Sequence, residues 1–360
     1  RSNCKNIPQH NQLHSRVKMT KNRKRSKAAT KALEKRILVT GGLGFIGHKV
    51  VEKLQAMKHT VDIVDVLTTY GLLDKEELEY LYNERLKCIS KDTQVHKIDI
   101  AEIEQLNSVF EQAKPDYVIH LASFPNDKLA RGNPVEAAHT MCQGLANVLE
   151  NSVRHNVKKI LYVSSSMVLG SFSDETSPTG ANEFHNTDPT GTYAIWKRAG
   201  EQLLQQCHKE HGLDYTTVRP SAVYGPLDNG NRVVAKFLIN AMRDKKLSVN
   251  GDTESLDFTY VDDLADGIIG ALLRGNTGIY HLTRGQGITI KQAAEIVVSI
   301  VGKGSVEIKE KDKNQPSRGT LDISKAKKDF EFNPKTDIEE GVKLYYEWIK
   351  DSVYWNSKTI

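Results

Sequence analysis

The sequence predicts an α/β protein built on a doubly wound parallel sheet, with a smaller α/β cap formed by the C-terminal part of the chain. Short β-branched runs alternate with helical patterns from residue 36 to about residue 220, as in a parallel sheet covered by helices on both faces. A glycine-rich turn joins the first strand to the first helix, and after Pro220 the alternation loosens. With 360 residues, the chain can form both parts.

The elements follow from the period of the apolar residues along the chain. Buried parallel strands are expected at residues 36–40, 60–65, 95–98, 116–121, 159–164 and 215–219. Helices are expected after the glycine turn through about residue 54, and then at about 75–86, 103–112, 134–155 and 193–211. The later part of the chain predicts helices near 233–243, 290–301 and 337–350 and a short strand near 279–282.

Composition indicates an ordinary globular protein with a basic tail. No apolar run is long enough to span a bilayer, so no membrane contact is expected. The four cysteines are scattered, which favours a reducing, cytoplasmic setting over disulfides or a zinc site. Residues 1–36 carry twelve Lys and Arg against one acid, Glu34. We therefore expect residues 1–35 to be a disordered, solvated extension, and a contact with nucleic acid through it is the less favoured alternative.

The glycine turn predicts a dinucleotide site of the Rossmann type. Gly41 permits a tight turn, Gly44 lets the backbone approach a pyrophosphate, and Gly47 lets the following helix pack on the sheet. Asp65 ends the next strand, where its carboxylate can accept both ribose hydroxyls and repel a 2′-phosphate. Asp62 is the rival acid, but it lies in the middle of that strand. The pattern favours NAD over NADP.

A tyrosine and a lysine predict the catalytic pair. Tyr193 and Lys197 are four residues apart and lie on one helical face, where the ammonium would lower the pKa of the phenol. A phenolate there can take a proton from a sugar hydroxyl as hydride leaves. Such a spacing is usually a surface pair. Here it follows a strand that ends in Ser164, Ser165 and Ser166, behind a dinucleotide turn, which favours catalysis.

These motifs together resemble the extended short-chain dehydrogenase/reductase family, in its nucleotide-sugar epimerase/dehydratase branch. The resemblance runs from about Arg36 to Trp348. It is carried by Thr40–Gly47, Asp99-Ile100, His120–Ser123, Ser164–Gly170, Tyr193-x-x-x-Lys197, Arg219-Pro220, Val223–Pro226, Asp257–Asp263 and Leu321–Lys325. It implies bound NAD, a sugar-nucleotide substrate, most often a UDP-sugar, and a homodimer formed through two helices. Those helices would be the one ending near Gln112 and the one starting at Tyr193.

The resemblance also assigns roles to particular residues. Ser165 would be the catalytic hydroxyl beside Tyr193 and Lys197, and Ser165 and Ser166 would contact the substrate. Arg232 and Arg318 would bind its diphosphate, although a solvated loop arginine is an alternative for both. The cofactor would lie against Gly41, Gly44, Phe45, Ile46, Gly47, Asp65, Asp99, Ile100, Leu121, Ala122, Ser123, Tyr193 and Lys197. No metal site is expected: His208 and His211 lack a third ligand, and Asp262 and Asp263 are expected to cap a helix.

Departures from the family pattern favour epimerisation. Dehydratases of the branch keep acids just after the catalytic hydroxyl, where this chain has Ser166 and Met167. An epimerase needs no such acid, so we expect C4 epimerisation of a UDP-hexose through a transient 4-keto sugar. The alternatives are a 4,6-dehydratase, a 4-keto reductase, or a non-catalytic module that binds NAD or a sugar nucleotide. Residues 36–220, completed by segments near 255–283, would bind NAD, and residues 221–254 and 284–360 would bind the substrate.

Overall fold

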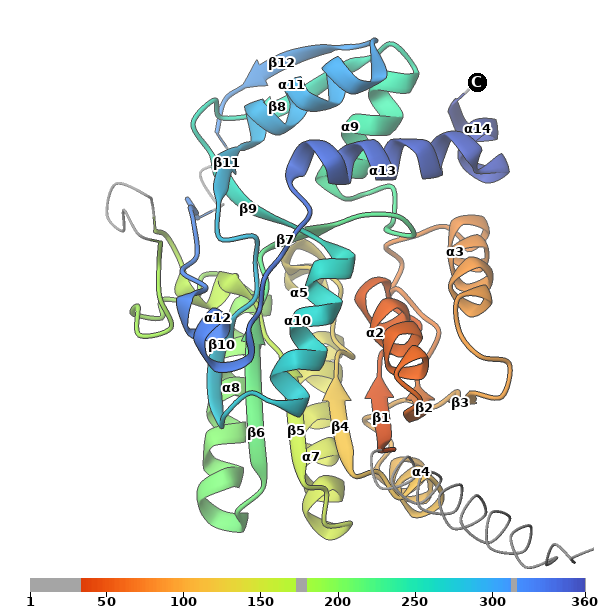
Figure 1. The fold of residues 1–360 in the computed structure, drawn as a ribbon, viewed down its shortest axis with the longest axis vertical. Helices are drawn as coiled ribbons and strands as arrows, with labels where there is room; N and C mark the ends of the chain where they lie inside the picture. Colours follow the sequence, from red (N-terminus) through yellow and green to blue (C-terminus); the bar gives the residue numbers. More distant parts are fainter. Residues whose placement is uncertain (1–33, 173–179, 312–315, 360) are drawn as a thin grey trace, which may run out of the picture.

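A parallel sheet forms the centre of the larger lobe (Figure 1). The structure is a computed structural model and describes residues 34–172, 180–311 and 316–359, so nearly all of the predicted tail lies outside the described residues. Within them, seven strands pair in the order β10-β6-β5-β4-β1-β2-β3, and every pair is parallel. The strands are β1 (Arg36–Thr40), β2 (Thr60–Val64), β3 (Gln94–His96), β4 (Tyr117–His120), β5 (Lys159–Val163), β6 (Asp214–Arg219) and β10 (Gly278–His281).

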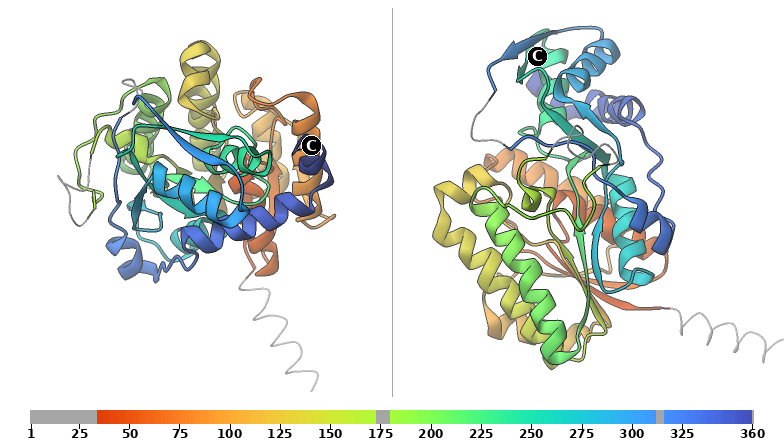
Figure 2. Two further views of the ribbon diagram at one scale, coloured as in Figure 1. Left: turned by 90° about the horizontal axis from the view of Figure 1, so that it is seen from above. Right: turned by 90° about the vertical axis from the view of Figure 1, so that its left-hand side faces the viewer.

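Helices cover both faces of the sheet, which confirms the predicted doubly wound fold (Figure 2). On one face lie α4 (Ile103–Ala113), α7 (Gly144–Arg154) and α8 (Thr192–His211), and on the other α2 (Phe45–Ala56) and α10 (Val261–Leu273). Each face has its own buried apolar cluster, one around Phe110 and Leu145 and one around Leu54 and Ile268. The strand order reverses beside β1, and ligands of such sheets bind at this point, outside the carboxyl ends of the strands.

The cap lies above those carboxyl ends (Figure 1). In the described part of the chain it contains β8 (Lys246–Asn250) paired in parallel with β12 (Ser305–Lys309). It also has its own apolar cluster, separate from the two that cover the sheet. Its helices are α9 (Val233–Met242), α11 (Ile290–Val301), α13 (Ile338–Asp351) and α14 (Val353–Thr359). A three-stranded sheet of β11 (Gly287–Thr289), β9 (Ser255–Tyr260) and β7 (Ala222–Tyr224) joins the two lobes.

Three sequence expectations need correction. The helix expected over residues 134–155 is α6 (Pro134–Ala138), a π-helical turn over His139–Gln143 and then α7. Of the segments near 255–283 that were expected to complete the main sheet, β9 pairs with β7 and β11 instead. The strand that completes the sheet is β10, which follows α10 and pairs with β6. Asp262 and Asp263 lie in the first turn of α10 and do not cap it: Asp262 pairs with Lys53 (3.5 Å), and Asp263 accepts from the Thr336 N–H (2.8 Å).

A buried ion pair ties α8 to the sheet. Arg219, at the end of β6, donates from Nε and Nη2 to the two carboxylate oxygens of Glu201, each at 2.7 Å. Both side chains are buried, with exposed fractions of 1% for Arg219 and 0% for Glu201. The same carboxylate accepts from the Ser164 hydroxyl at 2.7 Å, at the end of β5. One helix is thereby fixed to the carboxyl ends of two neighbouring strands.

Breaking this pair should cost far more stability than breaking an exposed pair. We expect Arg219→Met to lower the free energy of unfolding by about 3–5 kcal/mol, because the buried Glu201 carboxylate would lose its two-point partner and keep only the partly exposed Arg198, at 3.3 Å. Arg154→Met is the matched control. Arg154 pairs with Glu150 on the surface, and such pairs contribute about 0–1 kcal/mol. Urea unfolding measures both, and equal losses in the two variants would contradict the prediction.

Candidate active site

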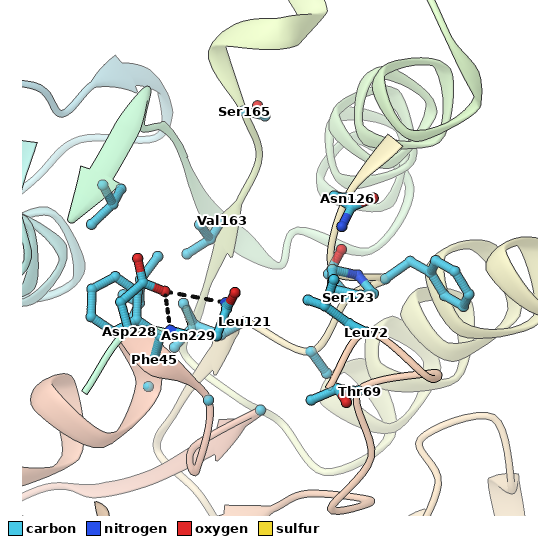
Figure 3. A pocket seen from close by; sticks show the side chains of 18 of the residues that line it. Phe45, Thr69, Leu72, Leu121, Ser123, Asn126, Val163, Ser165, Asp228 and Asn229 are labelled. Atoms are coloured by element: carbon cyan, nitrogen blue, oxygen red, sulfur yellow. Dashed lines mark hydrogen bonds between the residues drawn. The ribbon is translucent and has the colours of Figure 1, made fainter. Parts of the chain in front are cut away.

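A cavity of about 430 Å³ opens at the carboxyl ends of the strands, between the main sheet and the cap (Figure 3). Every residue that the sequence assigned to the cofactor lines this cavity, and so do Ser165, Arg232 and Arg318. Ser166 is the exception. It is 1% exposed, begins a short 3₁₀ turn, and does not line the cavity. The structure therefore gives no support to a substrate contact by Ser166.

The glycine turn has the geometry of a phosphate cradle. Gly41 has φ +70°, and a Cβ there would lie 2.7 Å from the Ala122 nitrogen. A Cβ at Gly44 would lie 3.1 Å from the Gly41 carbonyl oxygen. The helix α2 then begins at Phe45 with no side-chain cap, so its first N–H groups face the cavity mouth with the positive end of the helix dipole. The turn therefore fits the pyrophosphate of a dinucleotide.

Asp65 closes the same turn from the neighbouring strand. Its carboxylate accepts from the Leu43 N–H at 3.0 Å and from the Leu67 N–H at 2.9 Å. Burial raises the pKa of Asp65, and these two hydrogen bonds oppose the rise. The rival acid, Asp62, contacts His96 (3.1 Å) on the next strand and does not line the cavity. Of these two acids, Asp65 is therefore the one that lines the cavity beside the glycine turn.

Tyr193 and Lys197 lie on the cavity wall below the cap. The Lys197 Nζ donates to the Val163 carbonyl oxygen at 2.7 Å and lies 5.6 Å from the centroid of the Tyr193 ring. Burial lowers the pKa of Lys197 to about 7, and the charge of Glu201 opposes this. Burial raises the pKa of Tyr193, whereas the charge of Arg232 and the nearby Ser123 and Ser165 hydroxyls lower it. The cation that lowers the Tyr193 pKa here is Arg232, and acidification of the phenol by Lys197 stays a prediction.

The start of α8 is held by a residue that sequence reasoning missed. Asp127 Oδ1 accepts from the Tyr193 N–H at 3.1 Å. Asp127 begins the short helix α5 (Asp127–Gly132) and also pairs with Arg131 (2.9 Å). It therefore fixes Tyr193 through the backbone. The only sequence signal was an Asn-Asp pair shortly after a buried strand, which is also the pattern of an ordinary helix cap.

Other cavity residues come from segments that carry no recognised motif. Two of these residues come from the long segment between β2 and β3, residues 65–93, here called the insertion. They are Tyr70, which follows β2, and Arg85, in α3 (Lys75–Lys87). The Tyr70 hydroxyl lies 3.0 Å from the hydroxyl of Thr140, in the π-helical turn. Asp228 and Asn229 lie on the wall formed by the cap (Figure 3). Tyr70 and Arg85 were not found from the sequence because an insertion of this kind has no fixed spacing relative to the glycine turn.

The two predicted arginines enter the cavity from different segments of the cap. Arg232, at the start of α9, lies 4.0 Å from the Asp228 carboxylate and is half-exposed. Burial lowers the pKa of Arg318 to about 10, and its Nε has no hydrogen-bond partner among the described residues. Both guanidinium groups are therefore available to an anion. No cluster of three or more His, Cys, Asp or Glu side chains suited to a metal is found in the described residues.

Fold and site together define a Rossmann-type enzyme that binds NAD. The chain belongs to the NAD-dependent epimerase/dehydratase family, whose family model matches residues 37–282. It is 31% identical to a UDP-glucuronate 4-epimerase of Thermodesulfobacterium geofontis (strain OPF15), over 88% of this chain and 96% of the relative. This confirms the resemblance, the fold class, the enzyme class and the cofactor that the sequence predicted.

Two further relatives differ from the first, one in its reaction and the other in its sugar. The chain is 31% identical to UDP-glucuronic acid decarboxylase 3 of Arabidopsis thaliana, over 87% of this chain and 88% of the relative. Among solved structures, it is similar to the UDP-glucose 4-epimerase of Thermotoga maritima with UDP-glucose. That comparison has a TM-score of 0.78 and 30% identity, and covers 87% of this chain and 98% of the other. The family therefore leaves the reaction to be argued from the site.

Proposed function

We propose that this protein is an NAD-dependent epimerase that acts at C4 of a UDP-hexose through a transient 4-keto sugar. The observation that carries the proposal is the cavity wall around Tyr193. Ser165, Tyr193 and Lys197 line the cavity together, and the neighbour of Ser165 on that wall is Met167, which has no ionisable group. The wall can exchange a proton with a sugar hydroxyl, but Met167 cannot remove a proton from carbon or expel water.

Each catalytic side chain has a role that follows from its surroundings. Tyr193 takes the proton from the 4-hydroxyl of the sugar and later returns it, since its phenol lines the cavity together with Ser165 and Ser123. Ser165 orients the sugar hydroxyl, and its own Oγ accepts from the Met167 N–H at 3.2 Å. Lys197 keeps its Nζ 5.6 Å from the centroid of the Tyr193 ring through its bond to Val163. NAD, held by the Gly41–Gly47 turn and Asp65, would supply the group that stores and gives back the C4 hydride.

The substrate is proposed to enter between the lobes. Arg232 and Arg318 would hold its diphosphate, because a guanidinium group matches the geometry of phosphate oxygens. The cap also contributes Leu256 and Phe258 to the cavity, and both are apolar. A substrate held only at its diphosphate can rotate its sugar within such a wall. Rotation would present the second face of the 4-keto sugar, which epimerisation requires and a one-way reduction does not.

The reaction is tested by the mass of the product. We expect incubation with UDP-glucose and NAD to give a C4 epimer of unchanged mass, identified by NMR. Tyr193→Phe should reduce turnover by about 10²- to 10⁴-fold while NAD remains bound, because the variant loses only the proton-transfer group. Tyr346→Phe, in α13 outside the cavity, is the matched control and should keep full turnover.

Other products would assign the protein to another reaction. UDP-glucuronate, GDP-sugars and dTDP-sugars complete the substrate panel. A product lighter by one water indicates a dehydratase, and one lighter by carbon dioxide indicates a decarboxylase. A gain of two hydrogens with consumption of NADH indicates a 4-keto reductase. Binding without turnover across the whole panel would indicate a non-catalytic module, and full turnover by Tyr193→Phe would remove this residue from the mechanism.

We also propose that the protein is a homodimer of cytoplasmic enzyme subunits. The two helices expected at the interface cannot act as one face, because α7 lies between α4 and α8. We therefore place the interface on α8, where Ile195 and Leu203 are 50% and 37% exposed and lie on one side. No helix in the described residues is long and apolar enough to cross a membrane.

Light scattering tests the dimer. At micromolar concentration we expect the mass of two chains, and the mass of one chain for the double variant Ile195→Glu and Leu203→Glu. The reason is that two carboxylates per subunit would be buried opposite each other at the interface. A wild-type protein with the mass of a single chain would reject the proposal, and so would a double variant that keeps the mass of two.

A further inference from the structure

An arginine from the polar insertion joins the two walls of the cavity. Arg85 is 5% exposed and lies in α3. Its Nη1 donates to the carbonyl oxygen of Leu43, in the glycine turn, at 3.0 Å. Its Nη2 donates to the carbonyl oxygen of Leu227, in the cap, at 2.8 Å. One rigid guanidinium group thus spans the cofactor cradle and the segment that leads to Arg232.

Residues 227–232, whose first carbonyl group accepts the hydrogen bond from Arg85, are here called the substrate loop. It starts in a conformation that needs support, since Leu227 has φ +67°, a value that residues other than glycine rarely adopt. The insertion supplies a second contact, because Glu77 Oε1 accepts from the Gly230 N–H at 2.8 Å. From the other side, the ring of Trp355 packs so closely that a Cβ at Gly230 would lie 2.9 Å from it.

Charge explains why an arginine can be buried at this place. Asp228, in the same loop, is fully buried, and its charge is the largest influence that opposes the lowering of the Arg85 pKa by burial. One Asp228 oxygen accepts from the Asn229 N–H at 2.8 Å and lies 4.0 Å from Arg232 Nε. The other has no hydrogen-bond partner in the described part of the chain. Burial raises the pKa of Asp228 to about 7, and the charges of Arg232 and Arg85, one from each lobe, oppose that rise.

We propose that Arg85 is a positioning residue that sets the substrate loop, and with it Arg232, at a fixed place relative to the glycine turn. The inference rests on the proposed function, in which Arg232 binds the substrate diphosphate and the turn binds the cofactor. Arg85 itself need not touch either molecule. Its two carbonyl contacts transmit the position of one binding segment to the other, so that both ligands meet beside Tyr193.

Hydrogen exchange tests the coupling without reference to turnover. The experiment uses the full chain with saturating NAD and measures amide exchange by mass spectrometry. In Arg85→Met we expect exchange at least about tenfold faster in both segments, residues 41–47 and 227–232, because each loses a hydrogen bond to a charged donor. Lys75→Met is the matched control, since Lys75 is an exposed cation of the same helix, and it should change neither segment.

A double variant separates positioning from neutralisation of a buried charge. Arg85→Met with Asp228→Asn removes the uncompensated carboxylate. If Arg85 positions the loop, exchange in both segments is as fast in the double variant as in Arg85→Met. The KM for UDP-glucose is then about tenfold higher in both variants than in the wild type, and kcat changes less. Wild-type exchange in the double variant, or in Arg85→Met alone, would overturn the proposal. Wild-type protein that turns over no sugar nucleotide would refute the proposed function, whereas the exchange data would still decide the role of Arg85.

Discussion

The ion pair between Glu201 and Arg219 is the constraint on which the active site depends. Glu201 lies one turn beyond Lys197 and two turns beyond Tyr193, so the three side chains leave α8 on one side. Its carboxylate is fixed by Arg219 from β6 and by Ser164 from β5, each at 2.7 Å. Tyr193 and Ser165 thereby keep their places relative to each other. The pair also supplies the negative charge that partly offsets the burial of the Lys197 ammonium.

The rest of the site is arranged around this fixed wall by contacts between lobes. The larger lobe supplies the glycine turn, Asp65 and the proposed catalytic side chains, and the cap supplies Arg232 and Arg318. Arg85 bridges the two lobes from the insertion. A cap with its own apolar cluster can hold a substrate while the sheet holds a cofactor. An enzyme that returns hydride to the same carbon needs this division, because the sugar must turn while both ends of the site stay in place.

Much of this could be predicted from the sequence, for physical reasons that also mark the limit. Gly41, Asp65 and the Tyr193 pair occupy positions fixed by the geometry of a strand, a turn and a helix, so spacing together with the order of the elements predicts them. Arg85 and Asp127 act through contacts between distant segments, and no local period records such contacts. The resemblance placed Ser166 against the substrate, yet the chain turns into a 3₁₀ helix there and buries it. The influence of Arg232 on the pKa of Tyr193 was not foreseen, because the cap brings Arg232 to the site from a distant part of the sequence.

The central claim is that this site removes hydrogen from C4 of the sugar and returns it to the same carbon. The most direct test is turnover of UDP-glucose that carries deuterium at C4, in ordinary water with catalytic NAD. The proposed mechanism predicts a C4 epimer that retains the deuterium at C4, observed by mass and NMR. It also predicts no net reduction of NAD. An epimer in which C4 carries hydrogen from solvent would contradict the mechanism, and so would deuterium moved to another carbon.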